Sequence, residues 1–174
     1  MDEAGEAEFE EFVRGRAAAL LRSAYLLTGD RHAAEDLVQE VLEQVYLRWR
    51  RIHGVPEAYA RRALVNRATN RWRLRRRRPE SPLLPGAGPL APDHAEEVVA
   101  QAAVVAALRD LPPRQRAVVV LRYLDDLGEA EVADVLGCSV GTVKSQASRG
   151  LAKLRTYLSP LRVGPSEAAT GGSR

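Results

Sequence analysis

The stretch that decides the fold is VADVLGCSVGTVKSQASRGLAKLR, residues 132–155. Its apolar residues recur at helical spacing on both sides of Gly137, and this pattern predicts one helix over 129–136 and a second that begins after Ser139. Glycine adopts the left-handed conformation that often ends a helix, and serine is a favoured N-cap of the helix that follows. Because so short a connection forces two helices to cross steeply, the stretch predicts a helix-turn-helix motif.

The second helix of this motif presents a polar and basic face opposite its apolar one. The side chains on that face are Thr142, Lys144, Ser145, Ser148, Arg149 and Lys153. Lysine and arginine bind guanine edges or phosphates, and serine and threonine reach either, so the helix is suited to the major groove of DNA. The alternative is an ordinary helical hairpin inside a bundle, which accounts for the spacing but not for the basic face.

The rest of the chain is also typical of helices. Apolar periodicity predicts them over 8–27, 31–50, 57–77, 95–110 and 114–124, with no alternation of the kind that strands show. Residues 79–94 are rich in proline and glycine, which regular elements tolerate poorly, and they predict a flexible linker. We therefore expect an all-α fold of two small helical domains, 1–78 and 95–158, followed by a disordered tail, 159–174.

The net charge of +3 conceals a strong segregation of charge along the chain. Residues 1–13 contain six acids and no base, whereas residues 48–78 contain twelve arginines and a single acid, Glu57. A merely solubilising helix face usually mixes signs to form ion pairs between neighbouring turns. Unmixed arginine at this density favours contact with a polyanion, which predicts a second nucleic-acid-binding element.

Four stretches, in this order, resemble the extracytoplasmic-function sigma factors, the smallest bacterial sigma-70-type proteins. They are AEDLVQEVLEQVYLRW (34–49), RRALVNRATNRW (61–72), LPPRQRAVVVLRYLDDL (111–127) and CSVGTVKSQASRGLAKLR (138–155). The segment FEEFVRGRAAALLRSAYLLTGDRHAAEDLVQE, residues 9–40, is similar to an actinobacterial, SigE-like branch of that family. The resemblance implies a region-2-like domain over 1–78, a region-4-like domain over 95–158, and a function in promoter recognition, promoter melting and transcription initiation.

The resemblance also implies site residues at the matching positions. Core RNA polymerase is expected to bind the second helix at Asp36, Gln39, Glu40 and Glu43. The minus-ten promoter element is expected to bind the arginine-rich helix at Arg62, Asn66, Arg67, Asn70, Arg71 and Trp72, although Trp72 is also compatible with a place in the core. The minus-thirty-five element is expected to bind Arg122, Lys144, Ser145 and Arg149, with Thr142 and Ser148 on the same helix face.

The partners that follow are core RNA polymerase, through the clamp and flap, promoter DNA, and an anti-sigma factor as a further candidate. No cofactor, metal or catalytic residue is expected, and the chain is not expected to be an enzyme. His32, Asp36 and Glu40 share a helix face at a spacing that metal ligands use, but no second cluster supplies more ligands. The alternative function is an autonomous helix-turn-helix repressor or activator that binds duplex DNA without polymerase.

The sequence predicts a cytoplasmic protein that does not insert into a membrane. No apolar run approaches the roughly 18 residues of a membrane-spanning helix. The acidic N-terminus lacks the basic and apolar regions of a secretory signal. The single cysteine, Cys138, cannot form an internal disulfide, which agrees with a reducing compartment.

Overall fold

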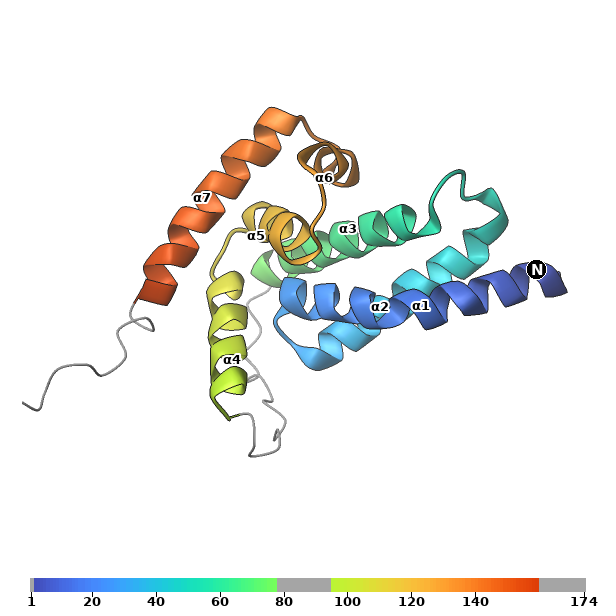
Figure 1. The fold of residues 1–174 in the computed structure, drawn as a ribbon, viewed down its shortest axis with the longest axis horizontal. Helices are drawn as coiled ribbons and strands as arrows, with labels where there is room; N and C mark the ends of the chain where they lie inside the picture. Colours follow the sequence, from blue (N-terminus) through green and yellow to red (C-terminus); the bar gives the residue numbers. More distant parts are fainter. Residues whose placement is uncertain (1, 78–94, 160–174) are drawn as a thin grey trace, which may run out of the picture.

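The computed structural model describes residues 2–77 and 95–159, and every regular element within them is helical. The predicted linker, 79–94, and residues 160–174 of the predicted tail lie outside the described residues. In chain order the elements are α1 (Glu3–Thr28), α2 (Arg31–Arg48), η1 (Trp49–Arg51), α3 (Pro56–Arg77), α4 (Ala95–Arg109), α5 (Pro113–Val119), η3 (Val120–Leu124), α6 (Glu129–Leu136) and α7 (Val140–Leu158). The predicted all-α class is confirmed (Figure 1).

The N-terminal helices α1, α2 and α3 pack on one another. Helix α1 ends at Thr28, and its C-cap, Gly29, has a left-handed φ of 71°. The Asp30 carboxylate then caps α2 by accepting a hydrogen bond of 2.7 Å from the Ala33 N–H. An aspartate directly before the predicted helix 31–50 is a favoured N-cap, and Asp30 takes that role. Helix α1 begins at Glu3, ahead of the predicted residue 8, because the Asp2 carboxylate accepts a 3.2 Å hydrogen bond from the Gly5 N–H.

The C-terminal helices build the predicted helix-turn-helix from α6 and α7. Gly137 takes a left-handed φ of 60°, and the Ser139 hydroxyl accepts a 3.1 Å hydrogen bond from the Thr142 N–H at the start of α7. Both predicted turn signals are confirmed. The predicted helix 114–124 differs, because after Val119 it continues as a wider π-helical turn, η3.

The two groups of helices share one hydrophobic core. Buried side chains of the N-terminal helices, Leu27, Leu37 and Leu64, belong to the same cluster as Val118 and Leu121 of the C-terminal helices. Helix α1 packs against α4, α5 and η3, and α6 packs on α3. The structure therefore closes the two groups on each other, a contact that sequence patterning did not predict.

Buried polar contacts cross the same boundary. The Arg116 guanidinium, 5% exposed, donates to the carbonyl oxygens of Leu27 and Arg109 at 2.6 Å each and to that of Leu111 at 3.2 Å. Burial and the nearby Arg109 lower the pKa of Arg116 to about 10, so it stays charged at neutral pH. This cation thus joins the end of α1 to α4 and α5.

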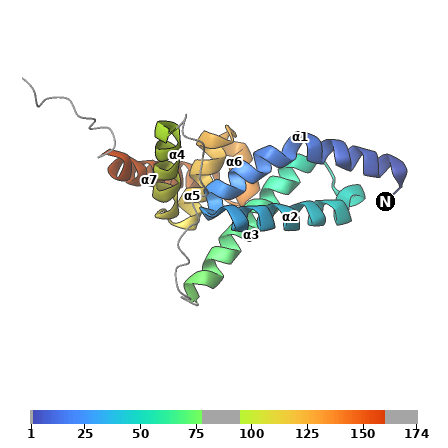
Figure 2. The same ribbon diagram turned by 90° about the horizontal axis from the view of Figure 1, so that it is seen from below.

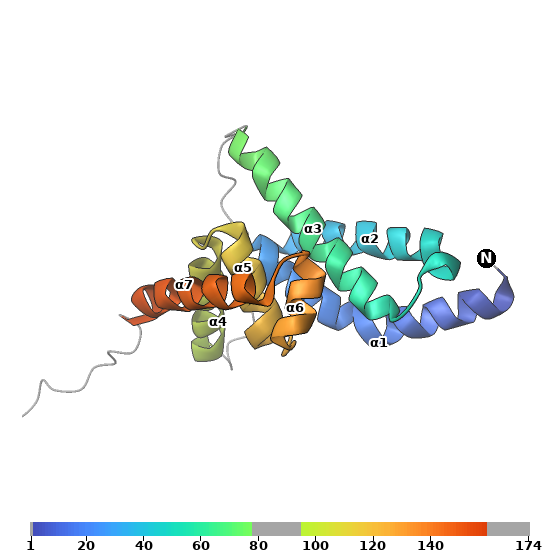
Figure 3. The ribbon, with the colours of Figure 1, turned by 90° about the horizontal axis from the view of Figure 1, so that it is seen from above.

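Two helices reach the ends of the molecule. The C-terminal end of α3 extends beyond the bundle, and α7 lies at the end of the molecule away from the N-terminus (Figures 2 and 3). Among the described helices, none combines the length and apolar character that crossing a bilayer requires.

Candidate nucleic-acid and partner-binding surfaces

Helix α2 presents a polar face because its opposite face supplies core residues. Leu37, Val41 and Val45 are fully buried, which leaves the predicted docking residues on the outer side of the helix. Asp36, Gln39 and Glu43 are exposed there, and within the described residues no hydrogen bond or ion pair engages their side chains. These three residues form the outer face of α2, which is open to a partner.

Glu40, the fourth predicted docking residue, is engaged by another helix. Its carboxylate oxygens lie 2.9 Å from Nη1 of Arg67 and 2.5 Å from Nη2 of Arg71. The side-chain oxygen of Gln44, one turn further along α2, accepts from Nε and Nη2 of Arg67 at 3.2 and 2.9 Å. The structure thus joins a residue predicted to bind polymerase to two residues predicted to bind DNA.

Helix α3 carries the other residues predicted to bind the minus-ten element. It packs through Ala60, Leu64 and Val65, so that Arg62, Asn66 and Asn70 are exposed. The Asn70 side-chain oxygen accepts a hydrogen bond from Arg73, and Trp72 is half-buried with a partner of its own. Arg62 reaches the helix-turn-helix, because a Cβ added to Gly137 would lie 3.7 Å from its Nη2 atom.

Helix α7 buries Val143, Ala147 and Gly150 against the core and turns its polar side outward. Lys144, Ser145, Ser148 and Arg149, all predicted to bind DNA, are exposed on it. Thr142 is half-buried, and its hydroxyl lies 2.9 Å from that of Ser139, so it belongs to the helix cap. The Lys144 Nζ atom lies 3.5 Å from a Glu129 carboxylate oxygen, which ties the recognition helix to α6.

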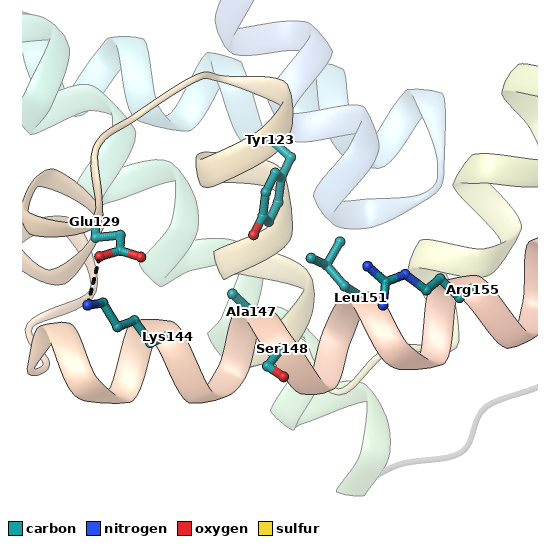
Figure 4. Close-up of a pocket in the computed structure, with 7 residues that line it drawn as sticks. All are labelled: Tyr123, Glu129, Lys144, Ala147, Ser148, Leu151 and Arg155. Atoms are coloured by element: carbon teal, nitrogen blue, oxygen red, sulfur yellow. Dashed lines mark ion pairs between the residues drawn. The ribbon is translucent and has the colours of Figure 1, made fainter.

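A groove of about 280 Å³ runs beside the recognition helix, between α7 and the segment that leads from η3 to α6 (Figure 4). Its lining residues are Tyr123, Glu129, Lys144, Ala147, Ser148, Leu151 and Arg155. Helical periodicity alone does not point to Tyr123 or Glu129, because only the packing of η3 and α6 brings them to α7, and Arg155 lies on α7 itself.

Arg122 behaves differently from the other residues predicted to bind the minus-thirty-five element. Its guanidinium donates to the Leu127 carbonyl and lies 5.5 Å from the centre of the Tyr123 ring. It is half-buried, so part of its donor capacity is committed to the loop before α6. Contact with DNA through Arg122 stays a prediction.

The spacing of His32, Asp36 and Glu40 along α2 does not produce a metal-binding cluster. Across residues 2–77 and 95–159, no group of three His, Cys, Asp or Glu side chains is arranged to hold a metal ion. The His32 ring nitrogen Nδ1 instead lies 3.8 Å from a Glu35 oxygen on the exposed side of the helix.

Comparison with known proteins places similar sequences over both groups of helices. Family profiles described as sigma-70 region 2 and sigma-70 region 4 match residues 12–78 and 101–154. The RNA polymerase sigma-E factor of Streptomyces coelicolor is 41% identical over 160 residues, which cover 87% of this chain and 86% of that protein. That of Streptomyces avermitilis is 43% identical, with 87% and 85% covered.

More distant relatives and solved structures agree with this likeness. The extracytoplasmic-function sigma factor SigE of Mycolicibacterium smegmatis is 33% identical, with 90% of this chain and 64% of that protein covered. The structure of the sigma factor RpoE from Bartonella quintana, solved with the anti-sigma factor NepR, matches with a TM-score of 0.68 at 24% identity. It covers 87% of this chain and 97% of RpoE, and at that identity it shows the fold alone.

Proposed function

The chain belongs to the sigma-70 family as an RNA polymerase sigma factor of the extracytoplasmic-function type, and from this membership we propose which surfaces carry out each step of initiation. The observation that carries the proposal is one chain that combines an open polar face on α2, an arginine-rich α3 and a basic helix-turn-helix. An autonomous repressor needs only the last of these, so that alternative is not favoured.

The first step is docking on core RNA polymerase through the outer face of α2. Asp36, Gln39 and Glu43 offer two carboxylates and an amide without internal partners among the described residues. Such a face fits a basic or amide-rich surface, and charge complementarity of this kind sets orientation and the rate of association. We assign the polymerase clamp to this face and the flap to the C-terminal helices.

The second step is opening of the minus-ten element by α3. Unpaired bases must be held out of their stack, which requires cations for the phosphates and polar groups or flat surfaces for the bases. Arg62 supplies charge, and Asn66 and Asn70 supply donors and acceptors that can read a base edge. We assign Arg67 and Arg71 to the phosphates and Trp72 to the border of this surface.

The third step is recognition of the duplex minus-thirty-five element by α7. Lys144, Ser145, Ser148 and Arg149 lie on its outer face, where a helix in the major groove contacts base edges and phosphates. Each phosphate neutralised on duplex DNA adds about 0.9 to the slope of log K against log salt concentration. Binding to the upstream element should therefore weaken steeply as salt rises.

These steps require no covalent chemistry by the chain, and we infer that it acts as a specificity subunit rather than an enzyme. Its place of action is then the cytoplasm, where promoter DNA and polymerase are found. An anti-sigma factor is a candidate partner that would compete with polymerase for the same surfaces.

The direct test adds the purified protein to sigma-free core polymerase on fragmented genomic DNA of its host, followed by mapping of RNA 5′ ends. We expect discrete start sites that depend on the protein and share two spaced upstream elements. Starts that are independent of the protein, together with a shift of duplex DNA by the protein alone, would instead support the repressor.

The docking face is tested separately by Asp36→Ala combined with Gln39→Ala. We expect weaker binding to core polymerase in a pull-down titration, because both substitutions remove polar contacts from the outer face of α2. Glu11→Ala, an exposed acid on α1, is the control for loss of negative charge. Equal affinity of the double variant and the control would contradict the docking assignment.

A further inference from the structure

Arg67 and Arg71 are held by acceptors within the protein. All three nitrogens of the Arg67 guanidinium donate, Nη1 to Glu40 at 2.9 Å and Nε and Nη2 to Gln44 at 3.2 and 2.9 Å. Arg71 donates from Nη2 to Glu40 at 2.5 Å and from Nη1 to the Ala33 carbonyl at 3.2 Å. Three of the five N–H donors of Arg67 and two of the five of Arg71 are therefore already engaged within the protein.

A carboxylate and a phosphate are alternative ligands for the same guanidinium. Both offer two or more anionic oxygens that match the planar fork of N–H donors. The single Glu40 carboxylate divides its oxygens between Arg67 and Arg71, so it occupies the place that a phosphate between the two arginines would take. A DNA phosphate can bind both arginines fully only after Glu40 has moved away.

The ion pairs of Glu40 with Arg67 and Arg71 are accessible to solvent. The exposed fractions of the side chains are 44% for Glu40, 39% for Arg67 and 29% for Arg71. Ion pairs that remain this accessible are weakly held compared with buried ones, because water and salt screen them. The pairs therefore hold the arginines in the free protein without making them inaccessible to a stronger polyanion.

Glu40 also lies on the helix that carries the proposed polymerase-docking face. It follows Gln39 directly and precedes Glu43 by one turn, and those two side chains are exposed without internal partners among the described residues. We propose that Glu40 is an intramolecular competitor of DNA phosphate at Arg67 and Arg71, and that docking of α2 on polymerase draws Glu40 away and frees both arginines. The second half of this inference rests on the proposed function.

The test is single-strand binding by the full-length protein in the absence of polymerase. A fluorescein-labelled 20-nucleotide single strand would be titrated with wild-type protein and with Glu40→Gln, and anisotropy would report binding. We expect Glu40→Gln to bind about 3- to 10-fold tighter, because it weakens two solvent-accessible ion pairs. Each arginine that gains a phosphate should also steepen the salt slope by about 0.7.

Glu35→Gln is the matched control, since it makes the same change of charge and shape on the same helix and its ion-pair partners, Arg31 and His32, are not predicted to bind DNA. We expect it to alter affinity by less than about 2-fold, through net charge alone. Replacing Arg67 and Arg71 by glutamine should abolish the gain that Glu40→Gln produces, as a double-mutant cycle requires for interacting groups.

Whether Glu40→Gln binds single-stranded DNA more tightly or more weakly than wild type distinguishes a competitor from a positioning residue. If Glu40 only orients the two arginines toward DNA, Glu40→Gln would bind the single strand more weakly than wild type. That result would contradict the proposed competition between Glu40 and phosphate. Affinity equal to that of Glu35→Gln would overturn it too. Circular dichroism checks that each variant folds. Glu40→Asp provides a second variant, which retains the charge but has a shorter side chain that reaches both arginines less well.

A second arm repeats the titration with saturating core polymerase. If polymerase already draws Glu40 away, the difference between wild type and Glu40→Gln should disappear in the holoenzyme, whereas a persistent difference would overturn the exchange. The free-protein arm does not involve polymerase. Failure of the proposed docking function would therefore appear as unchanged polymerase binding by Asp36→Ala with Gln39→Ala, independently of the single-strand result.

Discussion

At the scale of single residues, Arg149 is the most direct test of DNA recognition by α7. It is exposed on the helix, and among the described residues no ion pair engages it, whereas Lys144 is paired with Glu129. We predict that Arg149→Ala weakens promoter binding by about 1–3 kcal/mol if the guanidinium contacts a base edge. Footprinting of the upstream element within the holoenzyme measures this, with Arg14→Ala on α1 as the charge control. An upstream footprint equal to that of the control would remove Arg149 from the recognition surface.

Asp125 is a residue whose charge opposes folding. Burial raises the pKa of its carboxyl above the ordinary value of 3.8, although the 2.7 Å hydrogen bond from Ser23 and the positive charges of Arg61 and Arg22 offset part of this effect. Its Oδ2 atom is buried without a hydrogen-bond partner among the described residues. The nearby Glu57 raises the pKa further.

The raised pKa of Asp125 makes the free energy of unfolding depend on pH. Because the folded state binds the Asp125 proton more tightly than the unfolded chain, the residue lowers the free energy of unfolding as pH rises from about 3.8 through its folded pKa. We predict that Asp125→Asn stabilises the protein at pH 7 and removes this part of the slope. Urea unfolding at several pH values measures it, with Asp134→Asn on the exposed side of α6 as control. Parallel stability curves for wild type and Asp125→Asn would contradict the assignment.

At the scale of elements, the close packing of α7 on α5 depends on Gly150. A Cβ added there would lie 2.9 Å from Cγ2 of the buried Val119, closer than real contacts allow. The role of Gly150 could not be predicted, because a glycine within a helix gives no local sign of the neighbour that requires it.

We predict opposite effects for the same substitution at two positions of α7. Gly150→Ala should destabilise the protein by about 1–2 kcal/mol, since overpacking costs about 1–3 kcal/mol and the gain in helix propensity returns up to about 1 kcal/mol. Gly141→Ala should be neutral or stabilising, because the nearest atom to its added Cβ, Oγ of Ser139, lies at an ordinary 3.8 Å. Chemical denaturation of both variants measures the difference, and equal stabilities would contradict the predicted clash between the added Cβ and Val119.

Local signals in the sequence predicted the elements whose boundaries depend on local chemistry. Asp30, Gly137 and Ser139 act through hydrogen bonds or dihedral angles of their immediate neighbours, and all three perform the predicted roles. The π-helical turn η3 escaped prediction because the apolar pattern runs unbroken through Leu124. Only the structure shows the Asp125 N–H bonding to the Val120 carbonyl at 2.9 Å, five residues back.

In the candidate sites too, helical periodicity predicted which side chains are exposed but not which of them contact another helix. Exposure of Asp36, Asn66 and Arg149 could be predicted, because helical periodicity fixes which side of a helix faces the core. The engagement of Glu40 by Arg67 could not, since it joins residues on two helices that only tertiary packing brings together. Contacts of this kind carry no local pattern, and they alter the role of a residue whose position was predicted correctly.

At the scale of the whole molecule, the two groups of helices share one buried core, and we predict that they unfold together. Their common core runs from α1 through α5 and η3, and Arg116 binds carbonyl oxygens on both sides of the boundary. Sequence patterning suggested two small domains, and domains of that size are marginal on their own. Mutual packing is a physical means of stabilising both.

Arg116→Met tests whether this coupling holds. The substitution keeps a long, flexible side chain but leaves the carbonyls of Leu27, Arg109 and Leu111 without their donor, which should cost about 2–4 kcal/mol. Both tryptophans, Trp49 and Trp72, lie in the N-terminal helices, so their fluorescence reports that half, while hydrogen exchange of α5 and α7 amides reports the other. If the two halves fold as one unit, both probes should show the same loss of stability, because a two-state transition has a single free energy. Loss of protection in α5 and α7 with an unchanged fluorescence midpoint would instead show that the halves fold independently and that their contact is weak.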